Sequence, residues 1–276
     1  MDTVDSERGH QSSICLMRIT VAALALFAWE VLPRMEVIDP QFVPPLSSVL
    51  VTIRGLLENG DLLTHTLVSL QRAFSGLLAA TLIGLPLGLV LGGWFPRLQQ
   101  ALEPLMELFA QANPVILAHI IIFFLGIGEV AKIFTICWLC IWPITFSTIA
   151  GIRDVDPQLM KAARSLGLGR WQLFLHVALP ASAPSFFTGL RLAAGYAFLM
   201  LIASEMMGAS NGLGWLVMQS QENYHIQRIF AGATIITALA VLTDLLLKVL
   251  EKRTLVWTDN GSGWLKPQGP GIPVGE

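Results

Sequence analysis

The feature that most constrains this chain is a set of long segments without charged side chains. Residues 73–96, 108–128 and 133–152 contain no Asp, Glu, Lys or Arg. An α-helix needs about 20 mainly apolar residues to cross the hydrocarbon core of a bilayer, and an ionised group at its centre costs about 3 kcal/mol or more. These three segments are therefore predicted to be membrane-spanning helices.

Two further segments are apolar with few interruptions. The segment 229–247 contains one charged residue, Asp244, and the segment 186–207 has one Arg near its start and one Glu near its end. Charged side chains near the end of a span can reach the interface, so both segments are predicted to cross the membrane.

The N-terminal run 19–32 is short for a span unless residues 14–17 join it and Arg18 extends to the interface. The residues after this run lack the small-residue cleavage site of a signal peptide, which favours a retained first helix. The sequence thus predicts an all-α membrane protein with about six transmembrane helices.

The distribution of Lys and Arg predicts that both termini are cytoplasmic, because cytoplasmic loops carry an excess of these residues. An N-in, C-in topology places most of the 17 basic residues inside, namely Arg8, Arg18, Arg97, Arg153, Lys161, Arg164, Arg170, Arg191, Lys248, Lys252, Arg253 and Lys266. The predicted organisation is a cytoplasmic segment 1–13, a transmembrane domain 14–253 and a flexible cytoplasmic tail 254–276, which is rich in Gly and Pro.

Composition excludes several other classes. The net charge of −2 provides no basic field for nucleic acid. The three cysteines are too few for a disulfide framework. Cys137 and Cys140 have the spacing of a redox or half-zinc motif, but they have no second pair and lie in an uncharged run, so packing is the preferred interpretation. No group of residues has metal-ligand spacing, and no metal is expected.

Between the predicted fourth and fifth spans, residues 153–180 carry their own helical pattern. Asp156 and Pro157 are typical of a helix N-terminus, and Gly167 is placed to end that helix about three turns later. A second helical stretch is predicted over 170–177, ending at Leu179–Pro180. The segment is therefore predicted to be a helical hairpin at the cytoplasmic surface.

The first helix of this hairpin is predicted to be amphipathic. Its apolar residues recur at helical spacing and are expected to share one face, which consists of Leu159, Met160, Ala163 and Leu166. Lys161, Arg164 and Ser165 are then left to water or to a partner.

The spacing of small residues in this hairpin resembles the E-A-A-x3-G-x9-I-x-L-P signature of importer-type ABC permeases. Ala162 and Ala163 are followed by Gly167 four residues later and by Val177–Pro180 ten residues beyond that. Further segments resemble the nitrate, sulfonate, taurine and bicarbonate branch of that family, namely Pro44–Ser47, Ser69–Arg72, Gly126–Glu129, Ala203–Glu205 and Ser210–Gly214.

The resemblance implies a multi-pass permease of the bacterial inner membrane that moves a small anion. It also implies that the permease pairs with a second copy or a paralogue, and works with two ATP-binding cassette subunits and an extracytoplasmic solute-binding protein. The permease itself is no enzyme and binds no cofactor, since ATP and Mg²⁺ belong to the partner ATPase. The chain has no G-x4-G-K-[ST] phosphate-binding stretch, which agrees with this expectation.

The hairpin resembles the coupling helix, which inserts into a groove on the ATPase. The residues expected to couple to the ATPase are Asp156, Lys161, Ala162, Ala163, Gly167, Arg170, Trp171 and Pro180. The sequence departs from the signature at Lys161, which stands at the usual acidic position. Three interpretations stay open: the ATPase groove supplies a carboxylate opposite Lys161, Asp156 and nearby charges take over the role, or the permease is a heterodimer with one degenerate motif.

Polar residues within spans are candidates for the translocation path or a gate, although many only bond to one another. The candidates are Arg72, Gln111, Asn113, His119, Ser204 and Glu205. Glu129 and Lys132 are expected to form ion pairs with this set at the outer end of the spans, and structural pairing is the preferred interpretation. Gln111 and Asn113 precede a proline that can open a polar pocket, while His119 and Ser204 are equally explained by bonds within the protein.

Two outer segments are expected to receive the solute-binding protein or to serve as ordinary connections. The first contains an amphipathic stretch, Leu46–Leu57, with Arg54 and Glu58 on its wet side, and the second is the loop and helix over 208–227. A secondary transporter or channel is the main alternative class, but no inverted repeat or charged relay is evident. A membrane-embedded enzyme would need a motif such as H-E-x-x-H, which the chain lacks.

Overall fold

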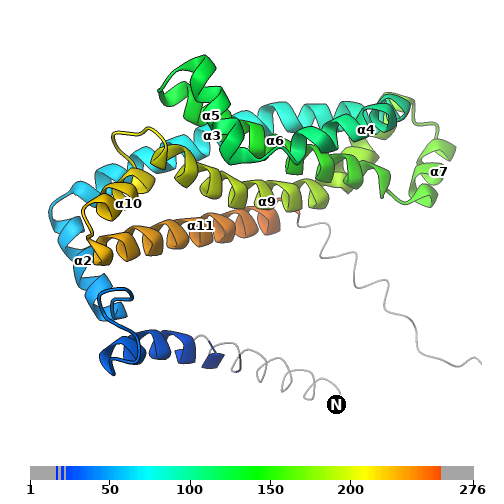
Figure 1. Ribbon diagram of the computed structural model, residues 1–276. Coiled ribbons are helices and arrows are strands. Elements are labelled where there is room, and N and C mark those ends of the chain that lie inside the picture. The colour runs from blue at the N-terminus through cyan, green and yellow to red at the C-terminus, as the bar shows by residue number, and fades with distance from the viewer. Residues whose placement is uncertain (1–16, 18–19, 22, 256–276) are drawn as a thin grey trace, which may run out of the picture. The chain divides into compact units, whose positions relative to one another are not determined.

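The structure is a computed structural model that describes residues 17, 20–21 and 23–255 (Figure 1). The described residues form helices and no strands, so the predicted all-α class is confirmed. Residues 23–34 are helical. The labelled helices that follow are α2 (Leu46–Glu58), α3 (Asp61–Gly93), α4 (Pro96–Ala110), α5 (Pro114–Leu125), α6 (Glu129–Arg153), α7 (Pro157–Ser165), α8 (Arg170–Leu173), the π-helix η1 (Phe174–Ala178), α9 (Leu179–Met206), α10 (Leu213–Glu222) and α11 (Ile226–Thr254).

Four helical segments in the described part of the chain are long and apolar enough to cross a membrane. They are α3, α6, α11 and the continuous run Arg170–Met206, which includes α8, η1 and α9. The predicted spans at 73–96, 133–152, 186–207 and 229–247 each lie largely within one of these helices, and the helices extend beyond them, by 12 residues before residue 73 and 16 residues before residue 186. The membrane class predicted from uncharged stretches is therefore confirmed.

The uncharged segment 108–128 is not one continuous helix, which differs from the expected simple span. It is divided between α4 and α5, whose axes are bent by 86° at the break. The Asn113 side chain accepts hydrogen bonds from the backbone N–H groups of Val115 and Ile116, at 3.0 and 3.3 Å, and Pro114 occupies the first position of α5. A capping side chain followed by proline starts a new helix, and the two helices together are still long and apolar enough to form one broken span.

Several expectations at the two ends of the chain lie outside the described residues. These are the segment 1–13, part of the first span over 14–32, and the tail beyond residue 255. The predicted amphipathic outer stretch is described and forms α2. Its Arg54 and Glu58 side chains are exposed and form an ion pair, with Nε and Oε1 2.8 Å apart.

The chain divides into two compact units. The first comprises Met1–Gln71 and Glu205–Thr237, and the second comprises Arg72–Ser204 and Ala238–Glu276. The second unit contains the predicted hairpin and the helices that flank it, and the first contains α2 and α10.

In the second unit, helix α6 packs closely against α3 through glycines of α3. A Cβ atom on Gly76 would lie 2.5 Å from Ile136 Cγ2, and one on Gly88 would lie 2.7 Å from Thr148 Cβ. Real Cβ contacts are not this short, so only glycine permits the two helices to approach this closely. Small residues at helix crossings are the usual means of close packing in membrane proteins.

Helix α6 is packed just as closely against α9. A Cβ on Gly189 would lie 2.5 Å from Ser147 Cβ, and the buried thiol of Cys140 donates a hydrogen bond to the Ala193 carbonyl at 3.2 Å. Because α6 leads into the hairpin and α9 follows it, this packing fixes the two helices between which the hairpin is held.

Candidate functional site

The hairpin begins as the sequence predicts. The Asp156 carboxylate accepts a hydrogen bond from the Gln158 N–H at 2.7 Å, and Pro157 is the first residue of α7. The helix ends at Ser165, and Gly167 has a φ of +79°, a conformation that favours glycine. The predicted N-cap and stop signal are confirmed.

The predicted apolar face of α7 is buried over part of its surface only. Ala163 is buried and Met160 is half-buried, but Leu159 is 50% exposed and Leu166 is 81% exposed. The helix has only nine residues, it contacts α8 and η1, and Ala163 is its one buried residue. The uncovered apolar surface, with Ala162 beside it, is available to a partner.

Aromatic side chains connect the hairpin to the end of α3. The Trp94 ring centroid lies 4.0 Å from that of Phe174 and 5.5 Å from that of Trp171. A Cβ on Gly93 would lie 2.7 Å from Phe174 Cε2, so glycine is needed at this contact. Sequence reasoning did not single out Trp94 or Phe174. Their signal was the gathering of large aromatics near the ends of predicted spans, where such residues favour the interface.

A cavity of about 740 Å³ lies where the hairpin meets the ends of α3 and α6. Its lining includes Met160 and Arg164 of α7, Arg170 of α8 and Ile152 of α6. The hairpin therefore contacts the rest of its unit along part of its length only. Figure 1 shows α7 at the extremity of this unit.

The second helical stretch of the hairpin does not end at Leu179–Pro180, contrary to the prediction. The chain passes from α8 through the π-helix η1 into α9. The Leu179 N–H donates to the Phe174 carbonyl five residues earlier, which widens the turn next to Pro180. Pro180 has no N–H to donate, so one backbone hydrogen bond of the helix is missing there. The wider π turn accommodates the missing bond, and the helix continues. Motion of the hairpin would therefore be passed directly to α9.

In the second unit, the ion pairs expected between Arg72, Glu129 and Lys132 are present. Arg72 Nε and Nη2 each lie 2.6 Å from a Glu129 carboxylate oxygen, and Lys132 Nζ lies 3.2 Å from Oε1. Both cations are buried, whereas the Glu129 side chain is 57% exposed. This geometry supports structural pairing of α3 with α6, because a two-pronged contact between guanidinium and carboxylate fixes orientation.

In the first unit, Glu205 holds the start of α10. The Ser69 hydroxyl donates to both carboxylate oxygens, at 2.8 and 2.9 Å, and the Gly214 N–H donates to Oε2 at 2.8 Å. Ser69 also accepts from the Leu213 N–H at 2.8 Å. Gly212 has a φ of +119°, and a Cβ there would overlap the Glu205 carboxylate. The segment that sequence analysis identified as Ser210–Gly214 is thus wrapped around a buried carboxylate.

The remaining gate candidates make local bonds. Asn113 caps α5, the His119 Nδ1 atom lies 2.8 Å from the Val115 carbonyl oxygen, and Ser204 donates to the Leu201 carbonyl at 2.9 Å. Gln111 is the exposed C-cap residue of α4. Within the described residues, no group of three or more His, Cys, Asp or Glu side chains could hold a metal ion.

Residues 84–256 match the family described as the binding-protein-dependent transport system inner membrane component. The match covers well over half of the chain, and the chain belongs to this family. It is accordingly an inner-membrane transport component rather than an enzyme.

Named relatives cover most of the chain. It is 32% identical over 246 residues to the taurine transport system permease protein TauC of Escherichia coli K12, covering 87% of this chain and 89% of that protein. It is 30% identical over 245 residues to the putative aliphatic sulfonates transport permease protein SsuC of Bacillus subtilis 168, with coverage of 89% and 88%. The bicarbonate transport system permease protein CmpB of Synechocystis is 30% identical over 200 residues, with coverage of 72% and 71%.

Solved structures share the fold. An amino acid ABC transporter chain aligns with a TM-score of 0.57 at 18% identity, covering 74% of this chain and 96% of that chain. A chain of the inward-facing MetNI methionine ABC transporter aligns with a TM-score of 0.54 at 19% identity, covering 68% and 91%.

Proposed function

We propose that this chain is the permease subunit of an ATP-driven importer that moves a small anion across the inner membrane by alternating access. Two ATP-binding cassette subunits would bind at the hairpin, a second copy of this chain or a paralogue would complete the membrane pore, and a solute-binding protein would deliver the solute from outside. Both termini and the hairpin would then be cytoplasmic. The transmembrane domain would extend over about residues 14–253.

The observation that carries this proposal is the uncovered apolar surface of α7. Leu159, Ala162 and Leu166 are exposed at helical spacing along α7 and its C-cap, and an exposed apolar patch of this kind marks an interaction site. The small Ala162 side chain lets a partner approach the helix closely, as in a helix-in-groove contact. The ATPase subunit is the partner that we assign to this surface.

The choice of an anion rests on the relatives. Taurine, aliphatic sulfonates and bicarbonate, which appear in the names of three relatives, all carry an anionic oxygen-bearing group. Nitrate has the same character and stays among the candidates. Arg72 and Lys132 are buried cations of α3 and α6 that could attract an anion, but their bonds to Glu129 favour a structural part in the proposed outer gate.

Capture of the full assembly tests the proposal. The tagged chain, extracted in mild detergent, is expected to bring down an ATP-binding cassette subunit, and its ATPase rate should rise when a cognate solute and its binding protein are added. Taurine, alkanesulfonates, nitrate and bicarbonate are tested separately. Solute uptake by the purified chain without any ATPase would instead establish the alternative, a secondary transporter or channel.

The unusual Lys161 provides a second test. We propose that the ATPase groove presents a carboxylate to this exposed side chain, so Lys161→Glu is expected to lower ATP-dependent uptake about tenfold by placing like charges together. Gln158→Glu introduces a negative charge on an exposed position of the same helix and serves as the control. Unchanged or increased uptake with Lys161→Glu would contradict the proposed carboxylate and leave the other two interpretations, a role for Asp156 and nearby charges or a heterodimer with one degenerate motif.

A further inference from the structure

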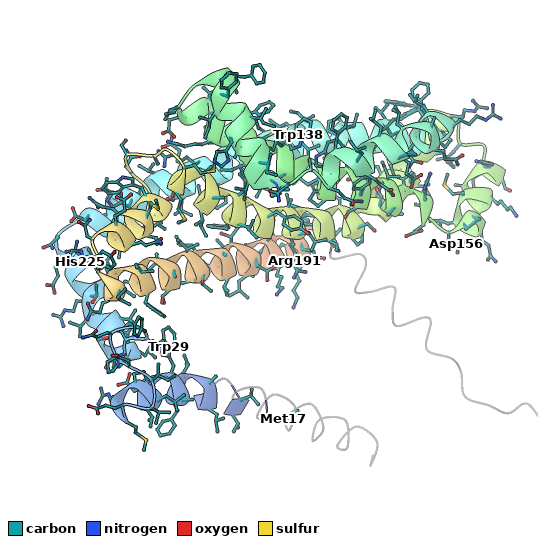
Figure 2. All side chains as sticks on the ribbon, viewed as in Figure 1. Met17, Trp29, Trp138, Asp156, Arg191 and His225 are labelled. Carbon is teal, nitrogen blue, oxygen red and sulfur yellow. The ribbon has the colours of Figure 1, made fainter. Side chains whose placement is uncertain are left out.

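A second cavity, of about 750 Å³, lies in the second unit between α9 and the last turns of α11. It is separate from the cavity beside the hairpin and shares no lining residue with it. Three cations line it, Arg191 from α9 and Lys248 and Lys252 from α11, together with one carboxylate, Glu251. Figure 2 shows Arg191 on the side of α9 that faces α11.

The charges at this cavity are partly neutralised by one another. Arg191 Nε lies 2.9 Å from Asp244 Oδ1, Lys248 Nζ lies 2.6 Å from Asp244 Oδ2, and Arg191 Nη1 lies 3.6 Å from Glu251 Oε2. Lys252 makes no ion pair with any residue that the structure describes, and its side chain is exposed. The cavity therefore presents a positive charge that this part of the chain leaves unneutralised.

The other wall of the cavity is apolar and continues along the surface of α11. Leu245 and Val249 line the cavity and are 51% and 52% exposed, and Leu242 and Leu246 are similarly exposed on the same helix. Because α11 is one of the helices apolar enough to cross a membrane, this surface is suited to contact hydrocarbon. Charged residues then recur from Asp244 to the end of α11, as expected where a span reaches the headgroup region.

We propose that this cavity binds an anionic phospholipid. The lipid phosphate would lie against Lys252 and Lys248, and an acyl chain would extend along Leu245 and Val249. A lipid with a negative headgroup would interact with both the basic and the apolar wall of the cavity, whereas a soluble anion would interact with the basic wall only. Basic pockets between transmembrane helices favour anionic headgroups in this way. If both termini are cytoplasmic, as in the proposed function, this lipid belongs to the cytoplasmic leaflet; the binding itself does not depend on that function.

The test is lipid binding to the purified full-length chain by native mass spectrometry. We compare phosphatidylglycerol with phosphatidylcholine, which carries no net charge, and expect a clear preference for phosphatidylglycerol. Lys252→Gln is expected to weaken phosphatidylglycerol binding about fivefold, as for the loss of one interfacial cation. This variant removes no ion pair, so folding should be unaffected. Glu251→Gln is expected to strengthen binding by a similar factor.

Arg253→Gln is the matched control, because it removes the same charge one residue further along α11, at an exposed position that does not line the cavity. Its effect is expected to stay below twofold. Equal weakening by Lys252→Gln and Arg253→Gln would overturn the proposal, as would equal binding of the two lipids. Displacement of phosphatidylglycerol by millimolar glycerol 1-phosphate would identify a site for a soluble phosphate and would also overturn it. None of these readouts requires an ATPase, so failure here is distinguishable from failure of the proposed importer function.

Discussion

Replacing Leu166 by Asp is expected to abolish ATP-dependent uptake, with a loss of about 100-fold or more, while the chain still folds and inserts. Leu166 is 81% exposed, so the substitution removes little packing within the chain. In the proposed complex it would bury an unpaired carboxylate in an apolar contact, which costs several kcal/mol, and about 3 kcal/mol corresponds to 100-fold in binding. Uptake in vesicles and co-purification of the ATPase subunit measure the effect.

Two variants control this experiment. Ser165→Asp introduces the same charge at an exposed neighbouring position on the polar side of α7, and is expected to retain most activity. Leu166→Met keeps an apolar side chain and should behave like the unchanged protein. If Leu166→Asp transports normally, α7 does not contact an ATPase through this surface.

Substitutions of Ala162 and Ala163 are expected to have different effects. Ala163 is buried against the hairpin itself, so a bulky residue there would damage the hairpin as well as any docking contact. Ala162 is exposed, and a bulky residue there tests docking alone. The sequence motif treats the two alanines alike, and only the packing of α7 distinguishes them.

Glu205→Gln is expected to reduce the free energy of unfolding by about 2–4 kcal/mol, because it weakens a buried, charge-assisted network. The carboxylate accepts two bonds from Ser69 and one from the Gly214 N–H, and the amide of Gln can accept through one oxygen only. Hydrogen exchange at Leu213 and Gly214 should become faster, because the Gly214 N–H bonds the carboxylate directly and the Leu213 N–H bonds Ser69, which the carboxylate holds in place. Thermal unfolding in detergent provides the second measurement.

Glu222→Gln is the control for this prediction. Glu222 is the exposed last residue of α10, so the same chemical change there should alter stability by less than about 0.5 kcal/mol. Normal stability and exchange of Glu205→Gln, combined with lost transport, would instead assign Glu205 to the translocation path. That outcome would contradict the structural interpretation given above.

The spans and the hairpin boundaries were predictable because their causes are local in sequence. An uncharged run of about 20 residues has to be shielded from water, whatever the rest of the chain does. Asp156, Pro157 and Gly167 act on the backbone within a few residues of themselves. The same is true of the break at Asn113–Pro114, whose signals were present but were outweighed by the apolar length of the segment.

Charge, periodicity and motif spacing were thus sufficient to predict the membrane class, the approximate spans and the family. Only the packed structure shows that Leu166 is uncovered while Ala163 is buried, that Trp94 contacts the hairpin, and that Glu205 accepts a hydrogen bond from the Gly214 N–H nine residues further on as well as from Ser69. These features depend on contacts between side chains that are far apart in the sequence, and residue spacing does not specify such contacts. Burial and hydrogen bonding depend on the packing of all the helices. They therefore distinguish residues such as Ala162 and Ala163, which are equivalent in the sequence motif.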